Sequence, residues 1–138
     1  MAGSTPGKSG KWIKSMTILL VYQKREQFQS LLELFQEQDN VQLLEAGSAE
    51  EALKKMQEEK VQVLVCAQTL PDMEGVVFLK QLVKINPLVN TVLVSDLPGK
   101  EFHEVTEGLG VLMQLPSVMD REHGQAILDK LAKVASLF

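Results

Sequence analysis

The chain has 138 residues, the length of about one domain, and its 45% hydrophobic and 23% charged residues are typical of a globular protein. With 14 basic and 18 acidic residues the net charge is −4, which argues against a protein that binds the phosphate backbone of nucleic acids. One cysteine excludes an intramolecular disulfide and a multi-cysteine zinc cluster, and no apolar run approaches the ~18 residues that a membrane span needs.

The first 15 residues differ from the rest, because they hold Lys8, Lys11 and Lys14 and no acidic residue. We expect residues 1–15 to be a flexible basic lead or an expression scar, and residues 16–138 to form one domain. The lead contains no apolar core of a signal peptide, and a lone free thiol fits a reducing compartment. A cytoplasmic location is therefore expected.

Strand and helix patterns alternate from residue 16 onward. The continuous apolar run at 17–21 predicts a strand buried on both faces, as in a parallel sheet. A helix face follows, and residues 42–46 predict a second strand. Ser48 and Glu51 have the spacing of a capping box, in which the Ser48 hydroxyl accepts from the backbone N–H of Glu51 and the Glu51 carboxylate reaches back to the N-terminus of the helix. The first helix has apolar residues at helical spacing at Phe28, Leu31, Leu32 and Phe35. The second helix, which begins after Ser48, has them at Ala49, Ala52, Leu53 and Met56.

The second half continues the same alternation. Residues 61–66, 91–95 and 111–115 predict three more strands, and a weaker helix is expected over 98–108. Pro87 ends the helix before the fourth strand, and Asp120 is placed to cap the last helix. Five strand–helix pairs with right-handed crossovers predict an α/β fold, a doubly wound parallel sheet.

The loop after the third strand reads Leu70-Pro71-Asp72-Met73-Glu74-Gly75. In register with five strand–helix units, it resembles the receiver domain of two-component response regulators, the CheY-like family. The resemblance covers residues 16–136 and includes the first strand, the start of the second helix at 47–53 and Leu115-Pro116. It implies a flavodoxin-like sheet of five parallel strands in the order 2-1-3-4-5.

The same resemblance implies that the chemistry of the family is lost. A receiver carries its phosphoacceptor aspartate where this chain has Ala67, and an acid pair for Mg²⁺ where it has Tyr22 and Gln23. The family lysine corresponds to Leu115 and the switch aromatic to Leu112, whereas the switch hydroxyl is retained as Ser95. The chain is thus expected to be a degenerate receiver, a pseudo-receiver, that has no catalytic residue, binds no metal or other cofactor and is not an enzyme.

Several side chains near this site have a plainer interpretation beside the functional one. Asp72 and Asp96 are the nearest acids for a substitute metal site, and Ser95 or Thr69 could accept a phosphoryl group instead of an aspartate. Turn and strand-end chemistry explains them more simply. Cys66 is expected to be a buried, inert thiol rather than a redox sensor. His103 and His123 are expected on the surface or at helix caps.

The expected role is a phosphorylation-independent protein–protein interaction module in signal transduction. By resemblance, the partner surface is built by the fourth helix, fifth strand and fifth helix, and the same surface could form a homodimer. Phe102 is either its aromatic anchor or a core residue. The partner-binding candidates are Lys100, Phe102, Val105, Leu112 and Gln114. No contact with nucleic acid or membrane is expected.

Three alternatives remain open on the sequence alone. The chain could be an atypical receiver that is phosphorylated at a non-standard site. It could also be a small flavodoxin-like protein that binds a cofactor at the carboxyl ends of its strands. Finally, it could be one domain of a longer regulator, since the apolar residues 136–138 could begin a linking helix.

Overall fold

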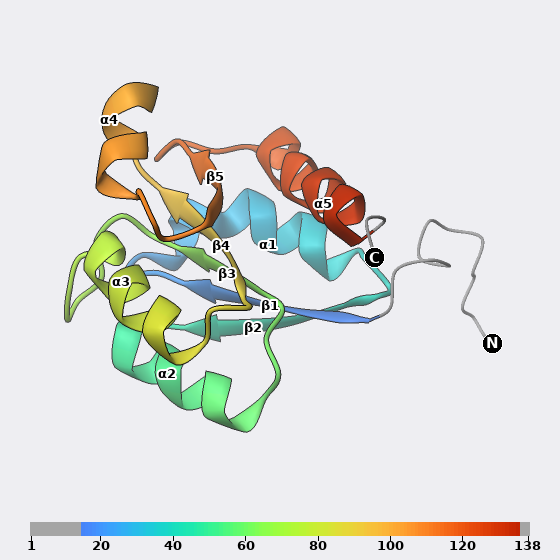
Figure 1. The fold of residues 1–138 in the computed structure, drawn as a ribbon. Helices are drawn as coiled ribbons and strands as arrows, with labels where there is room; N and C mark the ends of the chain where they lie inside the picture. Colours follow the sequence, from blue (N-terminus) through green and yellow to red (C-terminus); the bar gives the residue numbers. More distant parts are fainter. Residues whose placement is uncertain (1–14, 136–138) are drawn as a thin grey trace.

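Strands and helices alternate through residues 15–135, the part of the chain that the computed structural model describes (Figure 1). The predicted flexible lead, apart from Ser15, and the apolar residues 136–138 lie outside the described residues. The elements are β1 (Met16–Val21), the 3-10 turn η2 (Arg25–Phe28), α1 (Gln29–Gln36), β2 (Val41–Ala46), α2 (Ala49–Glu58), β3 (Val63–Cys66), α3 (Gly75–Ile85), β4 (Asn90–Val94), α4 (Gly99–Val105), β5 (Val111–Leu115) and α5 (Arg121–Ala135).

The sheet has five parallel strands in the order β2-β1-β3-β4-β5, which confirms the predicted α/β receiver fold. Helices α1 and α5 cover one face, while α2, α3 and α4 lie on the other (Figure 1). The central strands β1, β3 and β4 are almost wholly buried, and the edge strands β2 and β5 are mostly half-buried. Continuous apolar runs therefore mark the strands that are covered on both faces.

Element ends differ from the prediction where local hydrogen bonds intervene. The third strand begins at Val63 rather than at residue 61. The weaker helix is shorter than 98–108, since α4 ends at Val105 and the Thr106 hydroxyl donates to the carbonyl of Phe102 at 2.8 Å. Gly108 and Gly110 follow with φ of 84° and 66°, a conformation that breaks the helix and that other residues rarely adopt.

The predicted caps of α2 and α5 are present. Ser48 Oγ accepts from the backbone N–H of Glu51 at 3.0 Å, but the Glu51 carboxylate bonds the N–H of Gly47 at 2.7 Å rather than that of Ser48. Asp120 Oδ1 accepts from the N–H groups of Glu122 and His123, as expected for the cap of the last helix.

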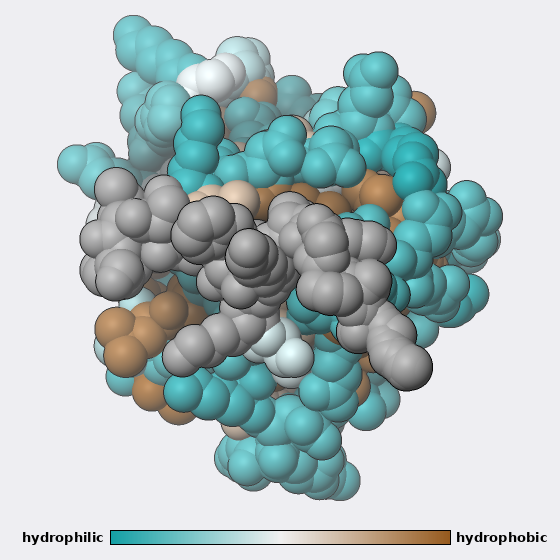
Figure 2. All heavy atoms as spheres, turned by 90° about the vertical axis from the view of Figure 1, so that its right-hand side faces the viewer, coloured by the Kyte–Doolittle hydropathy of each residue, from teal (hydrophilic) through white to brown (hydrophobic). Residues whose placement is uncertain are grey.

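The surface is mainly hydrophilic at the end of the molecule where β1 begins, with separate apolar patches (Figure 2). Within residues 15–135, no helix combines the length and the apolar character that crossing a membrane requires.

Candidate functional site

The residues predicted to correspond to the functional positions of a receiver lie together at the carboxyl ends of the strands. Tyr22 and Gln23 directly follow β1, Ala67 follows β3 and Ser95 follows β4. Backbone hydrogen bonds hold these ends in line, from Ala67 N–H to the carbonyl of Val21 (2.8 Å) and from Ser95 N–H to that of Leu115 (2.9 Å). In parallel sheets of this kind, ligands bind at this edge.

The centre of this edge is apolar and closed. Ala67 is 3% exposed and Leu115 is 0% exposed. Gly75, the first residue of α3, presses against the end of β3, because a Cβ added there would lie 2.3 Å from the carbonyl oxygen of Ala67. The positions predicted to correspond to the nucleophile and the cation therefore hold a methyl and an isobutyl group inside the core.

Tyr22 fills part of the position that corresponds to the acid pair and is turned toward β2. Its hydroxyl donates to the carboxylate of Glu45, which also accepts from Arg25 Nε at 2.7 Å. Burial, together with the Glu45 carboxylate, raises the pKa of Tyr22 to about 12. The hydrogen bond from Arg25 holds the pKa of Glu45 below its ordinary value. A phenol and an ion pair thus stand beside β1, while Gln23 is exposed.

Ser95 keeps its hydroxyl, but local hydrogen bonds use it. Its Oγ accepts from the N–H of Leu97 at 3.2 Å. Gln114 Nε2 donates to the carbonyl oxygens of Ser95 (2.8 Å) and Leu97 (2.9 Å), and Asp96 accepts from the N–H of Ser117 at 2.9 Å. The first of these bonds lies within the loop between β4 and α4, and the other three fix this loop to β5 and to the loop after it.

Asp72 and Asp96, the nearest acids for a substitute metal site, accept hydrogen bonds from backbone N–H groups. Asp72 accepts from Ala49 and Glu50, both at 3.0 Å, and so caps the start of α2. These bonds lower the pKa of Asp72, and the bond from Ser117 lowers the pKa of Asp96. Among residues 15–135, His, Cys, Asp and Glu side chains form no group of three or more that could hold a metal ion.

The remaining candidates occupy the positions that their plainer interpretations predicted. Cys66 is buried and its thiol donates to the carbonyl of Ala67 at 3.2 Å. Burial raises the pKa of this thiol to about 12, which keeps it protonated and unreactive at neutral pH. The Thr69 hydroxyl lies 3.3 Å from Glu74 Oε1. His103 is exposed, and His123 Nδ1 accepts from the N–H of Asp120 at the start of α5.

The predicted partner surface is only partly exposed. Lys100 and Val105 lie on the surface, with Val105 41% exposed. Phe102 is 4% exposed, so of its two expected roles the core position holds, and its place among the partner-binding candidates is corrected. Leu112 and Gln114 are half-buried in β5, and the Gln114 amide bonds within the domain.

Sequence reasoning missed three residues that shape the site: Glu45, Arg25 and the capping role of Asp72. Each makes its hydrogen bond with a residue at least 20 positions away in the chain: Arg25 donates to Glu45, and Asp72 accepts from the N–H of Ala49. Local periodicity carries no signal for such contacts.

The family model of the response regulator receiver domain matches residues 18–115. Among solved structures, the signal receiver domain of an HD domain-containing protein from Pseudomonas fluorescens Pf-5 is similar with a TM-score of 0.76 at 20% identity, over 99% of this chain and 94% of that one. A CheY-like receiver domain protein from Methanospirillum hungatei JF-1 has a TM-score of 0.73 at 20% identity, over 89% of this chain and 95% of that one. The chemotaxis response regulator CheY4 of Vibrio cholerae has a TM-score of 0.74 at 18% identity, over 85% of this chain and 98% of that one. Comparison with curated proteins gave no match.

Proposed function

Since this chain belongs to the response regulator receiver domain family, whose members are regulatory modules of two-component signalling, we propose that it is a pseudo-receiver that works without phosphorylation. In this proposal it is a protein–protein interaction module, not an enzyme, and it acts in the cytoplasm. The observation that carries the proposal is Ala67, a buried methyl group at the end of β3. A methyl group has no lone pair with which to attack a phosphodonor.

The other side chains at this edge support the same conclusion. Mg²⁺ needs hard oxygen ligands, usually carboxylates, and Tyr22 and Gln23 supply a phenol and a neutral amide. The Tyr22 hydroxyl is already bonded to Glu45. Leu115 is fully buried and offers no positive charge to a phosphoryl group. Joint loss of acids, nucleophile and cation leaves no cluster of like charges that would need a metal.

The fixed loop between β4 and α4 suggests how such a module would signal. Gln114 and Ser95 hold this loop through backbone groups, and Asp96 ties it to the loop after β5. A partner would then read one constant surface instead of two states. Lys100 and Val105 on α4, with Leu112 on β5, are the proposed contacts, and a second copy of the chain could use the same face.

The test is an amide NMR titration, first with Mg²⁺ and then with beryllofluoride, which mimics an acyl phosphate. We expect the amide signals of Ala67 and Ser95 to stay in place, and mass spectrometry after treatment with a small phosphodonor to show no added phosphoryl group. Shifts at sub-millimolar Mg²⁺, or a phosphoryl group on Ser95 or Thr69, would contradict the proposal. A flavin absorption band in the purified protein would favour a cofactor-binding protein instead.

Two variants make this test sharper. Ala67→Asp alone should remain unphosphorylated, because Mg²⁺ ligands and the lysine are still missing. It should also unfold more easily, since an unpaired carboxylate is buried. The same change combined with Tyr22→Asp, Gln23→Asp and Leu115→Lys should restore a beryllofluoride response, with circular dichroism as the check on folding. Phosphorylation of the single variant would show that the edge still binds the metal.

A further inference from the structure

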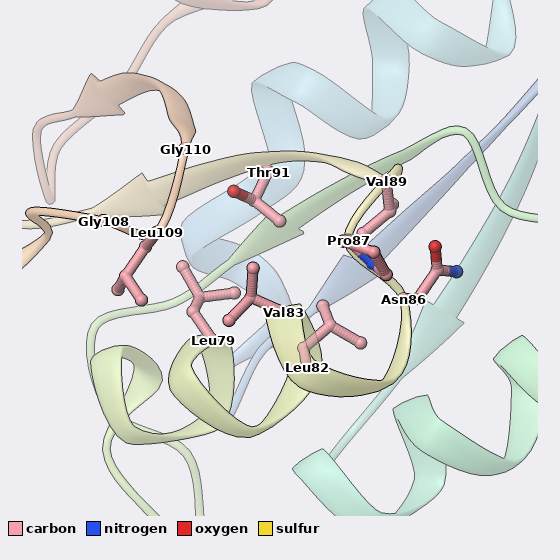
Figure 3. Close-up of a pocket in the computed structure, with 10 residues that line it drawn as sticks. All are labelled: Leu79, Leu82, Val83, Asn86, Pro87, Val89, Thr91, Gly108, Leu109 and Gly110. Carbon is pink, nitrogen blue, oxygen red and sulfur yellow. The ribbon is translucent and has the colours of Figure 1, made fainter.

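A separate pocket lies at the opposite end of the sheet from the degenerate phosphorylation site. It has a volume of about 240 Å³ and is enclosed by the carboxyl half of α3, the start of β4 and the loop before β5 (Figure 3). None of the described residues that line it carries a charge, and most of the lining side chains are aliphatic, the polar ones being those of Asn86 and Thr91. Leu79, Leu82 and Val83 come from α3, and Leu109 faces them from the loop.

Thr91 is the one lining residue with a hydroxyl group, and this hydroxyl is unusual for the domain. The residue is 6% exposed, and Thr91 Oγ1 has no hydrogen-bond partner among residues 15–135. The other buried hydroxyls, those of Thr17, Ser95 and Thr106, each make a hydrogen bond. A buried hydroxyl without a partner costs free energy, so such a group points to a missing binding partner or to a functional role.

The conformation of the loop beside the pocket is set by two glycines with positive φ and by a backbone hydrogen bond. Gly108 and Gly110 have φ of 84° and 66°, and the N–H of Leu109 donates to the carbonyl of Thr106 at 3.0 Å. In Figure 3 the Thr91 oxygen points toward this loop, across the pocket from α3. Two glycines in left-handed conformations therefore place Leu109 over the pocket without filling it with side chains.

We propose that this pocket binds a small, uncharged and mainly apolar molecule whose single polar group forms a hydrogen bond with Thr91 Oγ1. The aliphatic walls exclude an anion or a metal ion, because nothing on them compensates a charge. The volume suits a molecule with one ring, since an apolar cavity of ~150 Å³ already holds benzene. The ligand class is thus a phenol or an alcohol of similar size. This site is independent of the proposed signalling role.

The experiment compares phenol with toluene, which has the same ring and a methyl group in place of the hydroxyl. Each is titrated into the 15N-labelled full chain, and the amide shifts are followed. We expect phenol to shift the amides of Leu79, Val83, Thr91 and Leu109 and to bind about fivefold more tightly than toluene, the effect of one neutral hydrogen bond. Absence of shifts at these residues with both compounds would overturn the proposal.

Thr91→Val keeps the shape of the side chain and removes only the hydroxyl. The preference for phenol over toluene should then disappear, while toluene still binds; an unchanged preference would rule out the role of Thr91. Val83→Phe should fill the pocket and abolish binding of both compounds, and Val77→Phe, on the exposed side of the same helix, is its control. Equal binding to both phenylalanine variants would place the ligand elsewhere.

Discussion

Individual side chains at the strand ends decide the chemistry of this domain without changing its fold. Ala67 and Leu115, at the positions predicted to correspond to the nucleophile and the lysine of a receiver, are buried and pack as ordinary core residues. The Tyr22 hydroxyl donates to the carboxylate of Glu45. Because a buried apolar side chain stabilises the domain while a buried unpaired charge destabilises it, these substitutions are compatible with a stable core.

Gly75 allows a direct test of packing at this edge. Gly75→Ala should lower the free energy of unfolding by about 2 kcal/mol, since its Cβ would lie 2.3 Å from the backbone oxygen of Ala67 and that oxygen cannot rotate away. Gly99→Ala, at the start of α4, is the control, because a Cβ there has nothing within 4 Å. It should leave stability unchanged or raise it by about 0.5 kcal/mol. Urea unfolding measures both, and equal losses would argue against the close contact.

At the scale of elements, helices are tied to loops that follow other strands. Asp72, in the loop after β3, accepts from the first N–H groups of α2, and Gln114 in β5 holds the loop before α4. Arg121 at the start of α5 pairs with Glu37 at the end of α1. Such links set the positions of the helices relative to the strand ends.

Gln114→Ala should loosen the loop before α4. The variant loses two hydrogen bonds to the carbonyls of Ser95 and Leu97, so it should lose about 1 kcal/mol of stability, and the amide hydrogen of Leu97 should exchange several-fold faster. Gln125→Ala is the matched control, because the Gln125 amide bonds only the exposed side chain of Asp129. Hydrogen exchange followed by NMR measures the effect. Unchanged exchange at Leu97 would show that the loop is held by other contacts.

At the scale of the whole molecule, titrating groups define the pH range of stability. Glu37, Glu45, Asp72 and Asp96 all have a lowered pKa in the fold, so their stabilisation is present above their ordinary pKa values and is lost as the pH falls through the lowered ones. Tyr22 and Cys66 have a raised pKa of about 12. Their contribution is complete below the ordinary values of 10.0 and 9.0 and is lost as the pH rises toward 12.

The melting temperature should therefore be highest near neutral pH and fall on both sides. Tyr22→Phe should make the melting temperature fall less steeply at alkaline pH, leaving the part of the fall that is due to Cys66. It should not change the part of the fall at acidic pH that is due to Asp72 and Asp96. Thermal unfolding across pH measures this, and the absorbance of the chain's single tyrosine reports its pKa directly. Titration of this tyrosine near 10 in the folded protein would disagree with the bond to Glu45.

The sequence by itself determined the fold and carried the proposal that receiver chemistry is lost. Apolar runs and helical spacing depend on neighbours along the chain, so they predicted the strands and helices, while residue type predicted the caps at Ser48 and Asp120. The order 2-1-3-4-5 followed from the resemblance to receiver domains. The positions of Ala67, Tyr22 and Leu115 followed from register with the Pro71-Asp72 loop.

Only the tertiary structure decided how the remaining side chains are used. It placed Phe102 inside, joined Tyr22 to Glu45, turned Asp72 toward α2 and left the Thr91 hydroxyl beside a pocket. Each of these outcomes depends on residues that are distant in the chain and meet only after the sheet and its helices have packed. Spacing along the sequence records which face a residue occupies, whereas the partner that it meets there is set by the packing of other elements.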